Sequence, residues 1–345
     1  MKDRLPHARY RCVWTGALLA LLCITLFILC LFMGPVRIPC QVVAEILMGA
    51  DCGRPSWQYI IMESRLPQTL TALLCGASLA ASGLMLQTAF RNPLAGPDVF
   101  GISSGASLGV ALVMLLWGGS VSTALFSWTG FMAIIGAAFV GAMAVTAGIF
   151  VFSNVLRQAV MLLIIGMMVG YIASSAVSLL NYFATEEGVR SFMIWGMGNF
   201  GGVSMQLMPA FSALTLTALA ACLLLVKPLN LLSLGPYYAE SMGLNTRRMR
   251  NLLLVLVGLL TATTTAFCGP IAFIGLAVPH IARLLLGNED QRVLMPCTIL
   301  CGSGVALLCN LLCGLPGEGG TLPVNAITPI IGAPVIIYTI LRRTR

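Results

Sequence analysis

Residues 66–90 read LPQTLTALLCGASLAASGLMLQTAF, with no charged side chain in the whole run. About 20 apolar residues in an α-helix cross the hydrocarbon core of a bilayer, so this run is long enough to span it. Similar runs recur along all 345 residues, of which 59% are hydrophobic and only 9% are charged. A water-soluble globular protein needs more polar surface than this composition provides. The sequence therefore predicts an all-α polytopic membrane protein that forms a single domain over residues 1–345.

Ten runs of this kind are candidate membrane spans. The first is too long for the apolar part of a signal peptide and precedes no small-residue cleavage site, so we expect a retained helix. The third is short, and the eighth contains Pro279 and Arg283, so a kinked or partly submerged helix is expected there. The expected spans cover residues 13–33, 66–90, 100–117, 128–152, 158–183, 207–226, 251–268, 271–286, 293–313 and 324–341.

The basic residues predict the orientation. An even number of spans places both termini on one side of the membrane. If that side is the cytoplasm, 15 of the 19 Lys and Arg residues lie inside, and only Arg37, Arg54, Arg65 and Arg190 lie outside. Cytoplasmic loops carry such an excess of Lys and Arg. We therefore expect cytoplasmic termini, and the net charge of +8 needs no nucleic-acid partner to explain it.

The acidic residues avoid the cores of the expected spans. Carriers driven by an ion gradient usually keep an ionisable side chain within the membrane, so this pattern argues against such a carrier. Sodium binding by carbonyl groups at broken helices stays open. The 11 acids are Asp3, Glu45, Asp51, Glu63, Asp98, Glu186, Glu187, Glu240, Glu289, Asp290 and Glu318.

No constellation of residues indicates catalysis, a cofactor or a metal site. A phosphate-binding loop requires a lysine after a glycine-rich turn, and Lys2 and Lys227, the only lysines, have no such context. We therefore do not expect an enzyme, and a separate chain must supply any ATP hydrolysis. For His280, which follows Pro279, a structural hydrogen-bonding role is favoured over ligand binding.

The cysteines fall mostly within expected spans. Four of them recur at multiples of four on one helix, which favours packing between helices over a thiolate metal site. Cys40 and Cys52 lie in the first outer loop, and whether they pair stays open. The four aligned cysteines are Cys297, Cys301, Cys309 and Cys313.

Small residues also recur every four positions. Such stripes let helices approach closely in lipid, and lining a conduit is the alternative use. One stripe holds Gly101, Gly105 and Gly109, and the other holds Gly166, Gly170, Ser174 and Ser178.

Residues 228–250 form an inner segment that is too short to span the membrane. The pattern predicts one or two short amphipathic helices broken at Gly243. Its basic residues could anchor it to anionic lipid headgroups, and a rigid helix pair could also dock a soluble partner. The residues alone leave both uses open.

Short motifs in a fixed order resemble the FecCD family of permeases, the membrane subunits of binding-protein-dependent ABC importers for iron chelates, haem and cobalamin. The resemblance covers nearly the whole chain. The motifs are RLP (65–67), GASLAASG (76–83), RNPLAGPD (91–98), GISSGA (101–106), WGMG (195–198), LG (234–235), MGLN (242–245), GPIAFIGL (269–276), VPHIAR (278–283), LPV (322–324) and IGAP (331–334).

The resemblance implies a type II ABC importer permease fold with ten helices in the bacterial cytoplasmic (inner) membrane. It further implies a homodimer or pseudo-dimer with the translocation path at the subunit interface. One cytoplasmic ATPase would lie under each permease subunit, and an extracytoplasmic binding protein would deliver the substrate. No cofactor is implied.

The resemblance also implies roles for particular residues. Coupling helices at about 234–250 would dock on the ATPase. Arg65 would pair with the binding protein as an exposed charge, with headgroup anchoring as the alternative. The coupling residues are Leu234, Gly235, Ala239, Met242, Gly243, Leu244 and Asn245; the cytoplasmic gate is Asn92, Pro93, Leu94, Ala159 and Val160; and the translocation path is Gly166, Gly170 and Ser174.

Several positions depart from the family pattern and loosen the details of docking and coupling. We expect the permease of an iron-chelate importer, for a siderophore or haem, with cobalamin as the alternative. An ion-coupled carrier and a non-transporting scaffold are the other hypotheses. The departures are Gln68 in place of an arginine, Pro236 in place of an acid, Asn199 in place of a serine, and Thr321 and Asn325 in place of Glu and Gly.

Overall fold

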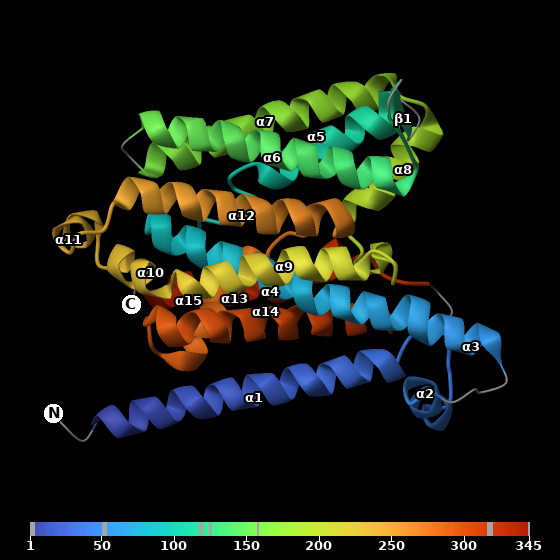
Figure 1. Cartoon of the computed structure of the whole chain (residues 1–345), viewed down its shortest axis with the longest axis horizontal. Helices are drawn as coiled ribbons and strands as arrows, with labels where there is room; N and C mark the ends of the chain where they lie inside the picture. The colour runs from blue at the N-terminus through green and yellow to red at the C-terminus, as the bar shows by residue number, and fades with distance from the viewer. Residues whose placement is uncertain are drawn as a thin grey trace.

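The long helices lie side by side with roughly aligned axes (Figure 1). The computed structural model describes residues 4–49, 54–116, 120–123, 126–156, 159–315 and 320–343. Its elements are α1 (Arg4–Phe32), α2 (Cys40–Leu47), α3 (Pro55–Tyr59), η1 (Ile60–Arg65), α4 (Leu66–Phe90), α5 (Ile102–Ala111), η2 (Leu112–Leu116), β1 (Ser120–Thr123), β2 (Phe126–Thr129), α6 (Phe131–Val155), α7 (Ala159–Phe183), α8 (Glu186–Gly196), η3 (Phe200–Gly202), α9 (Met208–Leu224), α10 (Val226–Ser233), α11 (Pro236–Ser241), α12 (Thr246–Cys268), α13 (Ile274–Leu286), α14 (Gln291–Cys313) and α15 (Val324–Arg343).

The all-helical prediction holds except at one hairpin. Strands β1 and β2 pair antiparallel, with Ser120 opposite Thr129. The expected span at 128–152 therefore begins too early, because residues 126–129 form a strand and the helix starts at Phe131.

Each of the ten expected runs contains a helix, but the helices differ in length. Six are long and apolar enough to cross a membrane, and α9 with α10 makes a seventh if this pair, bent by 53°, is one span. The segments Ile102–Leu116, Ile274–Leu286 and Val324–Thr339 are apolar but shorter. The short third run and the interrupted eighth run were expected to behave in this way.

Helix α4 forms the centre of the bundle. Almost its entire surface is buried, and its neighbours include α14, α12, α13 and α9. A Cβ atom on Gly76 would lie 2.2 Å from the carbonyl oxygen of Gly302, and one on Gly83 would lie 1.7 Å from that of Gly275. Only glycine permits such close approach of helix backbones, which is a common packing device in lipid.

The other glycine stripes serve the same purpose. A Cβ on Gly105 would lie 2.6 Å from the carbonyl oxygen of Gly141 in α6. A Cβ on Gly166 would lie 2.9 Å from the Cα of Phe100, so α7 packs directly on the segment that leads into α5. The packing interpretation of the stripes is therefore confirmed at these positions.

The cysteine stripe on α14 is also a packing surface. All four of its cysteines are buried, and the thiols of Cys23 and Cys30 in α1 donate to the carbonyls of Leu300 and Leu307 in α14. Within the described ranges, no group of three or more His, Cys, Asp or Glu residues is placed to hold a metal ion. Cys40 is exposed, and its suggested partner Cys52 lies outside the described residues.

The two ends of the bundle carry different elements. The first turn of α1 and the end of α15 lie at the same end as α10 and α11, whereas α2, α3, α8 and β1 lie at the opposite end (Figure 1). That both termini lie on the cytoplasmic side of the membrane stays a prediction.

The loop of residues 91–101 turns back into the bundle. A Cβ on Gly275 would lie only 2.9 Å from the ring of Pro97. Gly275 in turn packs on Gly83, which is seven residues before the end of α4. At 1.5 Å per helical residue, Gly83 is about 10 Å in from that end. Asp98 follows Pro97, so this acid belongs to a loop that packs within the bundle.

Candidate coupling and gating surface

Two short helices project from one end of the bundle. Helix α10 ends at Ser233, Gly235 adopts a φ of 117°, and α11 ends before Gly243, which adopts a φ of 85°. Both values lie in the region that favours glycine. The structure thus confirms two short helices in the segment but adds a break at Gly235 that the sequence pattern missed.

The residues expected to couple to an ATPase divide into a buried base and an exposed tip. Ala239 is fully buried, whereas Leu234 and Met242 are 62% and 60% exposed. Tyr237 is 86% exposed on the same helix. Apolar and aromatic side chains grouped on a projecting element are typical of a protein-docking surface.

The remaining coupling residues lie at the start of α12. Leu244 is half-buried, and its N–H donates to the carbonyl of Ala239. Asn245 caps α12, because its side-chain oxygen accepts from the N–H of Arg248 at 2.9 Å. Helix α11 is therefore joined to α12 by a short turn that these two hydrogen bonds hold in place.

Helix α10 is fastened to the start of α14. The Asn230 side chain donates to Asp290 Oδ1 at 2.7 Å and accepts from the N–H of Gln291 at 2.8 Å. Asp290 also caps α14 by accepting from the N–H of Arg292. That N–H, together with Asn230, lowers the pKa of Asp290 below its ordinary value, although partial burial opposes the shift.

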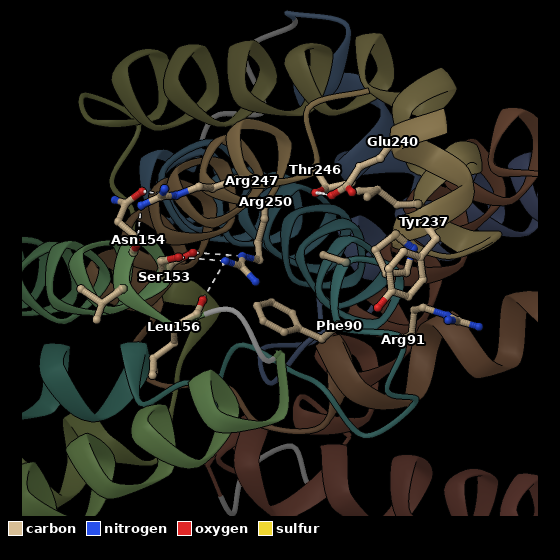
Figure 2. A pocket seen from close by; sticks show the side chains of 14 residues that line it. Phe90, Arg91, Ser153, Asn154, Leu156, Tyr237, Glu240, Thr246, Arg247 and Arg250 are labelled. Atoms are coloured by element: carbon tan, nitrogen blue, oxygen red, sulfur yellow. Dashed lines mark hydrogen bonds between the residues drawn. The ribbon is translucent and has the colours of Figure 1, made fainter. Parts of the chain in front are cut away.

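A cavity of about 710 Å³ lies between the ends of α4, α6, α11 and α12 (Figure 2). Arg250 donates from Nη2 to the carbonyls of Ser153 and Leu156, at 2.8 and 3.1 Å. Arg247 donates to the side chain and carbonyl of Asn154. The two arginines therefore satisfy carbonyl groups at the C-terminal end of α6, where cations are favourable.

In the sequence, Arg247 and Arg250 indicate only inner positive charge. Their position offered a signal, because cations in the first turn of a helix oppose its dipole and so call for a compensating partner. A second link closes the cavity where Thr246 Oγ1 donates to Glu240 Oε1 at 2.6 Å, which ties α11 to α12.

The expected gate residues Asn92, Pro93 and Leu94 form a tight turn after α4. Asn92 Oδ1 accepts from the N–H of Leu94 at 2.9 Å, and His280 Nε2 lies 2.9 Å from the carbonyl oxygen of Pro93. The structural role favoured for His280 is thus confirmed, and its specific task is to hold this turn.

Arg91 connects the turn to the coupling helices. It ends α4 with a φ of 47°, and its Nη1 is 3.4 Å from where a Cβ on Gly235 would lie. On the other side, Arg283 Nη1 donates to Gln87 Oε1 at 2.6 Å. Arg91, which directly precedes the gate turn, therefore contacts the glycine between α10 and α11, while the turn itself contacts α13 through His280.

The second expected gate region lies at the start of α7. Ala159 is its first residue, and Val160 is 63% exposed. The structure shows no contact of Val160 with the turn at 92–94 among the hydrogen bonds and packed clusters of the described residues.

Arg65 does not have the exposure expected of it. Only 6% of Arg65 is exposed, and its guanidinium donates to the carbonyls of Leu31, Phe32 and Val36. It satisfies the end of α1, because the last carbonyls of a helix have no partner within the helix. The expectation of an exposed charge at this helix mouth is therefore wrong.

The three residues expected to line the translocation path differ in their burial. Gly166 and Gly170 are buried against Phe100 and Gly101, whereas Ser174 is exposed on the outer face of α7. Tyr171 and Ile172 on the same helix are 67% and 71% exposed. Of the three, only Ser174 is in a position to contact anything outside this chain.

The chain is similar in sequence to permeases of known import systems. The vitamin B12 import system permease protein BtuC of Klebsiella pneumoniae is 38% identical over 286 residues, which is 83% of each chain. That of Salmonella arizonae is 36% identical over 293 residues, or 84% of each.

Solved structures agree with the sequence relatives. A metal-chelate type ABC transporter in an inward-facing conformation has a TM-score of 0.81 and 30% identity, over 95% of this chain and 98% of that one. PsaBC from Streptococcus pneumoniae, bound to a Fab, has a TM-score of 0.53 at 19% identity and supports the fold alone. The model of the FecCD transport family matches residues 21–342. The chain therefore belongs to the FecCD transport family, as the permease of an ABC importer.

Proposed function

We propose that this permease carries a metal chelate of siderophore, haem or cobalamin size, powered by a separate ATPase that docks on α11. The observation that carries the proposal is the contact between Gly235, which precedes α11, and Arg91, which precedes the gate turn. Docking at Tyr237 and Met242 would displace Gly235, and Arg91 lies directly against Gly235. A rigid-body push on the coupling helices would thus reach the turn at 92–94.

In this proposal all ten helical runs cross the membrane, including the three shorter ones, and the end that carries α10 and α11 faces the cytoplasm. The 15 inner basic residues support this orientation. Two copies, or this chain and a homologous one, would enclose the path, with an ATPase under each. The protein would reside in the bacterial cytoplasmic membrane.

A binding protein would deliver the chelate at the opposite end. Because Arg65 is buried, we propose that it supports the docking surface by holding the end of α1 in place. It also borders a cavity of about 210 Å³ with Gln68 and Thr321, two positions that depart from the family pattern. An exposed charge for the binding protein is offered nearby by Glu63 and Arg37.

The first chelate to test is cobalamin, because the relatives described above are vitamin B12 permeases. Co-purified permease, ATPase and binding protein should hydrolyse ATP faster with one of cyanocobalamin, haem or a ferric siderophore than without a chelate. If hydrolysis responds to none of these three classes, the chelate assignment is wrong.

One observation favours the ion-coupled carrier as the second candidate. Asp98 places an ionisable group within the bundle, which is a usual feature of such carriers. Uptake by proteoliposomes that contain the permease without any ATPase, driven by a proton or sodium gradient, would support the carrier and contradict the proposal.

A further inference from the structure

Asp98 lies deep in the bundle although it belongs to a loop. Pro97 packs at Gly275, the second residue of α13, which in turn packs on Gly83 of α4, and Gly101 packs at Gly166 and Gly170 of α7. Gly166 is seven residues from the start of α7, which corresponds to about 10 Å along the helix. The loop that carries Asp98 therefore reaches about 10 Å into the bundle from the helix ends.

Part of Asp98 is nevertheless exposed at the protein surface. On one side, Phe100 packs on Gly166 of α7. On the other side, Phe273 packs on Gly332 of α15, where a Cβ would lie 3.0 Å from the Phe273 Cβ. The Asp98 carboxylate accepts a hydrogen bond from the N–H of Phe273, so it sits between α7 and α15.

Two neutral donors partly offset the cost that burial imposes on the ionised carboxylate. Ser103 Oγ, in the first turn of α5, donates to Asp98 Oδ1 at 2.9 Å. Phe273 directly precedes α13, so two helix N-termini point toward the carboxylate, and such termini stabilise negative charge. Both donors are neutral, and the described residues place no Lys, Arg or His in an ion pair with Asp98.

Large apolar side chains of α7 and α15 are also exposed. Tyr171 and Ile172 of α7 and Ile330 of α15 are all more than 65% exposed. Lipid could cover these three side chains but not the carboxylate, because an ionised side chain facing hydrocarbon is costly. A second copy of the chain at this face could cover the apolar side chains and enclose water around the carboxylate.

We propose that Asp98 lines the translocation path between two copies of the chain and makes that path selective by charge, favouring neutral or cationic chelates and retarding polyanionic ones. This inference rests on the proposed function, because it requires a path at the α7–α15 face. In a dimer two such carboxylates would act on each passing chelate. Like charges repel strongly where water is scarce.

The test measures charge selectivity without requiring the chelate. Ser174→Cys, on the exposed face of α7 one turn beyond Gly170, serves as a reporter in a Cys40→Ser background, because Cys40 is an exposed native thiol. The complete transporter in membrane vesicles is labelled with a cationic and an anionic methanethiosulfonate reagent. We expect the cationic reagent to react faster, and Asp98→Asn to reduce the ratio of the two rates by about tenfold.

Matched variants separate charge from structure. Asp98→Glu keeps the charge and Ser103→Ala removes only a neutral donor, so both should preserve the ratio. An unchanged ratio in Asp98→Asn, or no labelling at Ser174→Cys by either reagent, overturns the inference. The labelling needs no ATP-driven uptake, so this failure is distinguishable from a failure of the proposed function.

Discussion

Helices α4 and α7 look alike in the sequence and differ in the fold. Both are uncharged over 25 residues and contain glycines four or seven positions apart. Yet 89% of the apolar stretch in Pro55–Phe90 is buried within the chain, against 22% in Val160–Phe183, which is the more hydrophobic of the two. In a membrane protein, hydrophobicity marks contact with lipid or with another subunit, whereas burial within the chain follows small residues on all sides of the helix.

The largest expected effect comes from filling the closest contact of α4. Gly83→Leu would drive a side chain into the backbone of Gly275, and we expect a loss of about 4 kcal/mol or failure to fold. Gly148→Leu on α6 is the matched control, because nothing lies within 4 Å of its Cβ position. Thermal unfolding in detergent measures both. Equal stability of the two variants would contradict the role assigned to α4.

A pair of identical truncations compares the two helices directly. Leu84→Ala, at a fully buried position in α4, should cost about 2–5 kcal/mol in the isolated chain. Leu179→Ala, at a position 61% exposed in α7, should cost less than about 0.5 kcal/mol. Denaturant unfolding of the purified permease provides the comparison. A large effect at Leu179 would mean that the chain itself covers this face of α7.

Gly243 tests coupling apart from folding. Gly243→Leu forces a φ of 85° on a residue with a Cβ, which costs about 1–2 kcal/mol. We expect binding-protein-stimulated ATP hydrolysis to fall severalfold while membrane insertion persists. Gly49→Leu imposes the same strain at the same φ, and its Cβ position is also empty, but it lies near α2 at the other end of the bundle. Equal loss of stimulated hydrolysis in both variants would refute a coupling role for Gly243.

The smallest expected effect concerns the attachment of α10. Asp290→Asn weakens the cap of α14 and its bond to Asn230, at a cost of about 1 kcal/mol. The pKa of Asp290 is lower in the folded protein, so this stabilisation is present at neutral pH and is lost as pH falls below 3.8, its ordinary pKa.

Hydrogen exchange of the α10 amides can follow this loss. The exchange rates of wild type and Asp290→Asn should differ at pH 7 and converge in acid. A difference that does not decrease at all between pH 7 and pH 3 would show that the charge of Asp290 is not what holds α10.

The sequence located the helices but not the paths of the loops between them. Uncharged runs mark helices because the bilayer imposes their length and polarity. No comparable rule fixes a loop, so the inward course of residues 91–101 and the depth of Asp98 could not be predicted from polarity alone. The strand pair before Phe131 was not predicted for a similar reason, because part of it was counted in the apolar run of the next helix.

Functional roles could be predicted only for residues that lie within recognisable sequence motifs. The roles predicted for Gly243 and for the turn at Asn92 come from the resemblance to a family. The burial of Arg65 was missed because charge predicts exposure unless a set of free carbonyls is close by, and the end of α1 became its neighbour only in the fold. Arg247 and Arg250 likewise donate hydrogen bonds to the end of α6, which is their neighbour only in the folded chain.

The central claim is that this chain is a conduit driven by another protein. Its most direct test is uptake of radiolabelled cyanocobalamin, haem or a ferric siderophore into proteoliposomes that contain the permease with its binding protein and ATPase. The account predicts accumulation of one of these chelates that requires ATP and an intact ATPase, and that no proton or sodium gradient can replace. Uptake driven by an ion gradient in vesicles without the ATPase would contradict it.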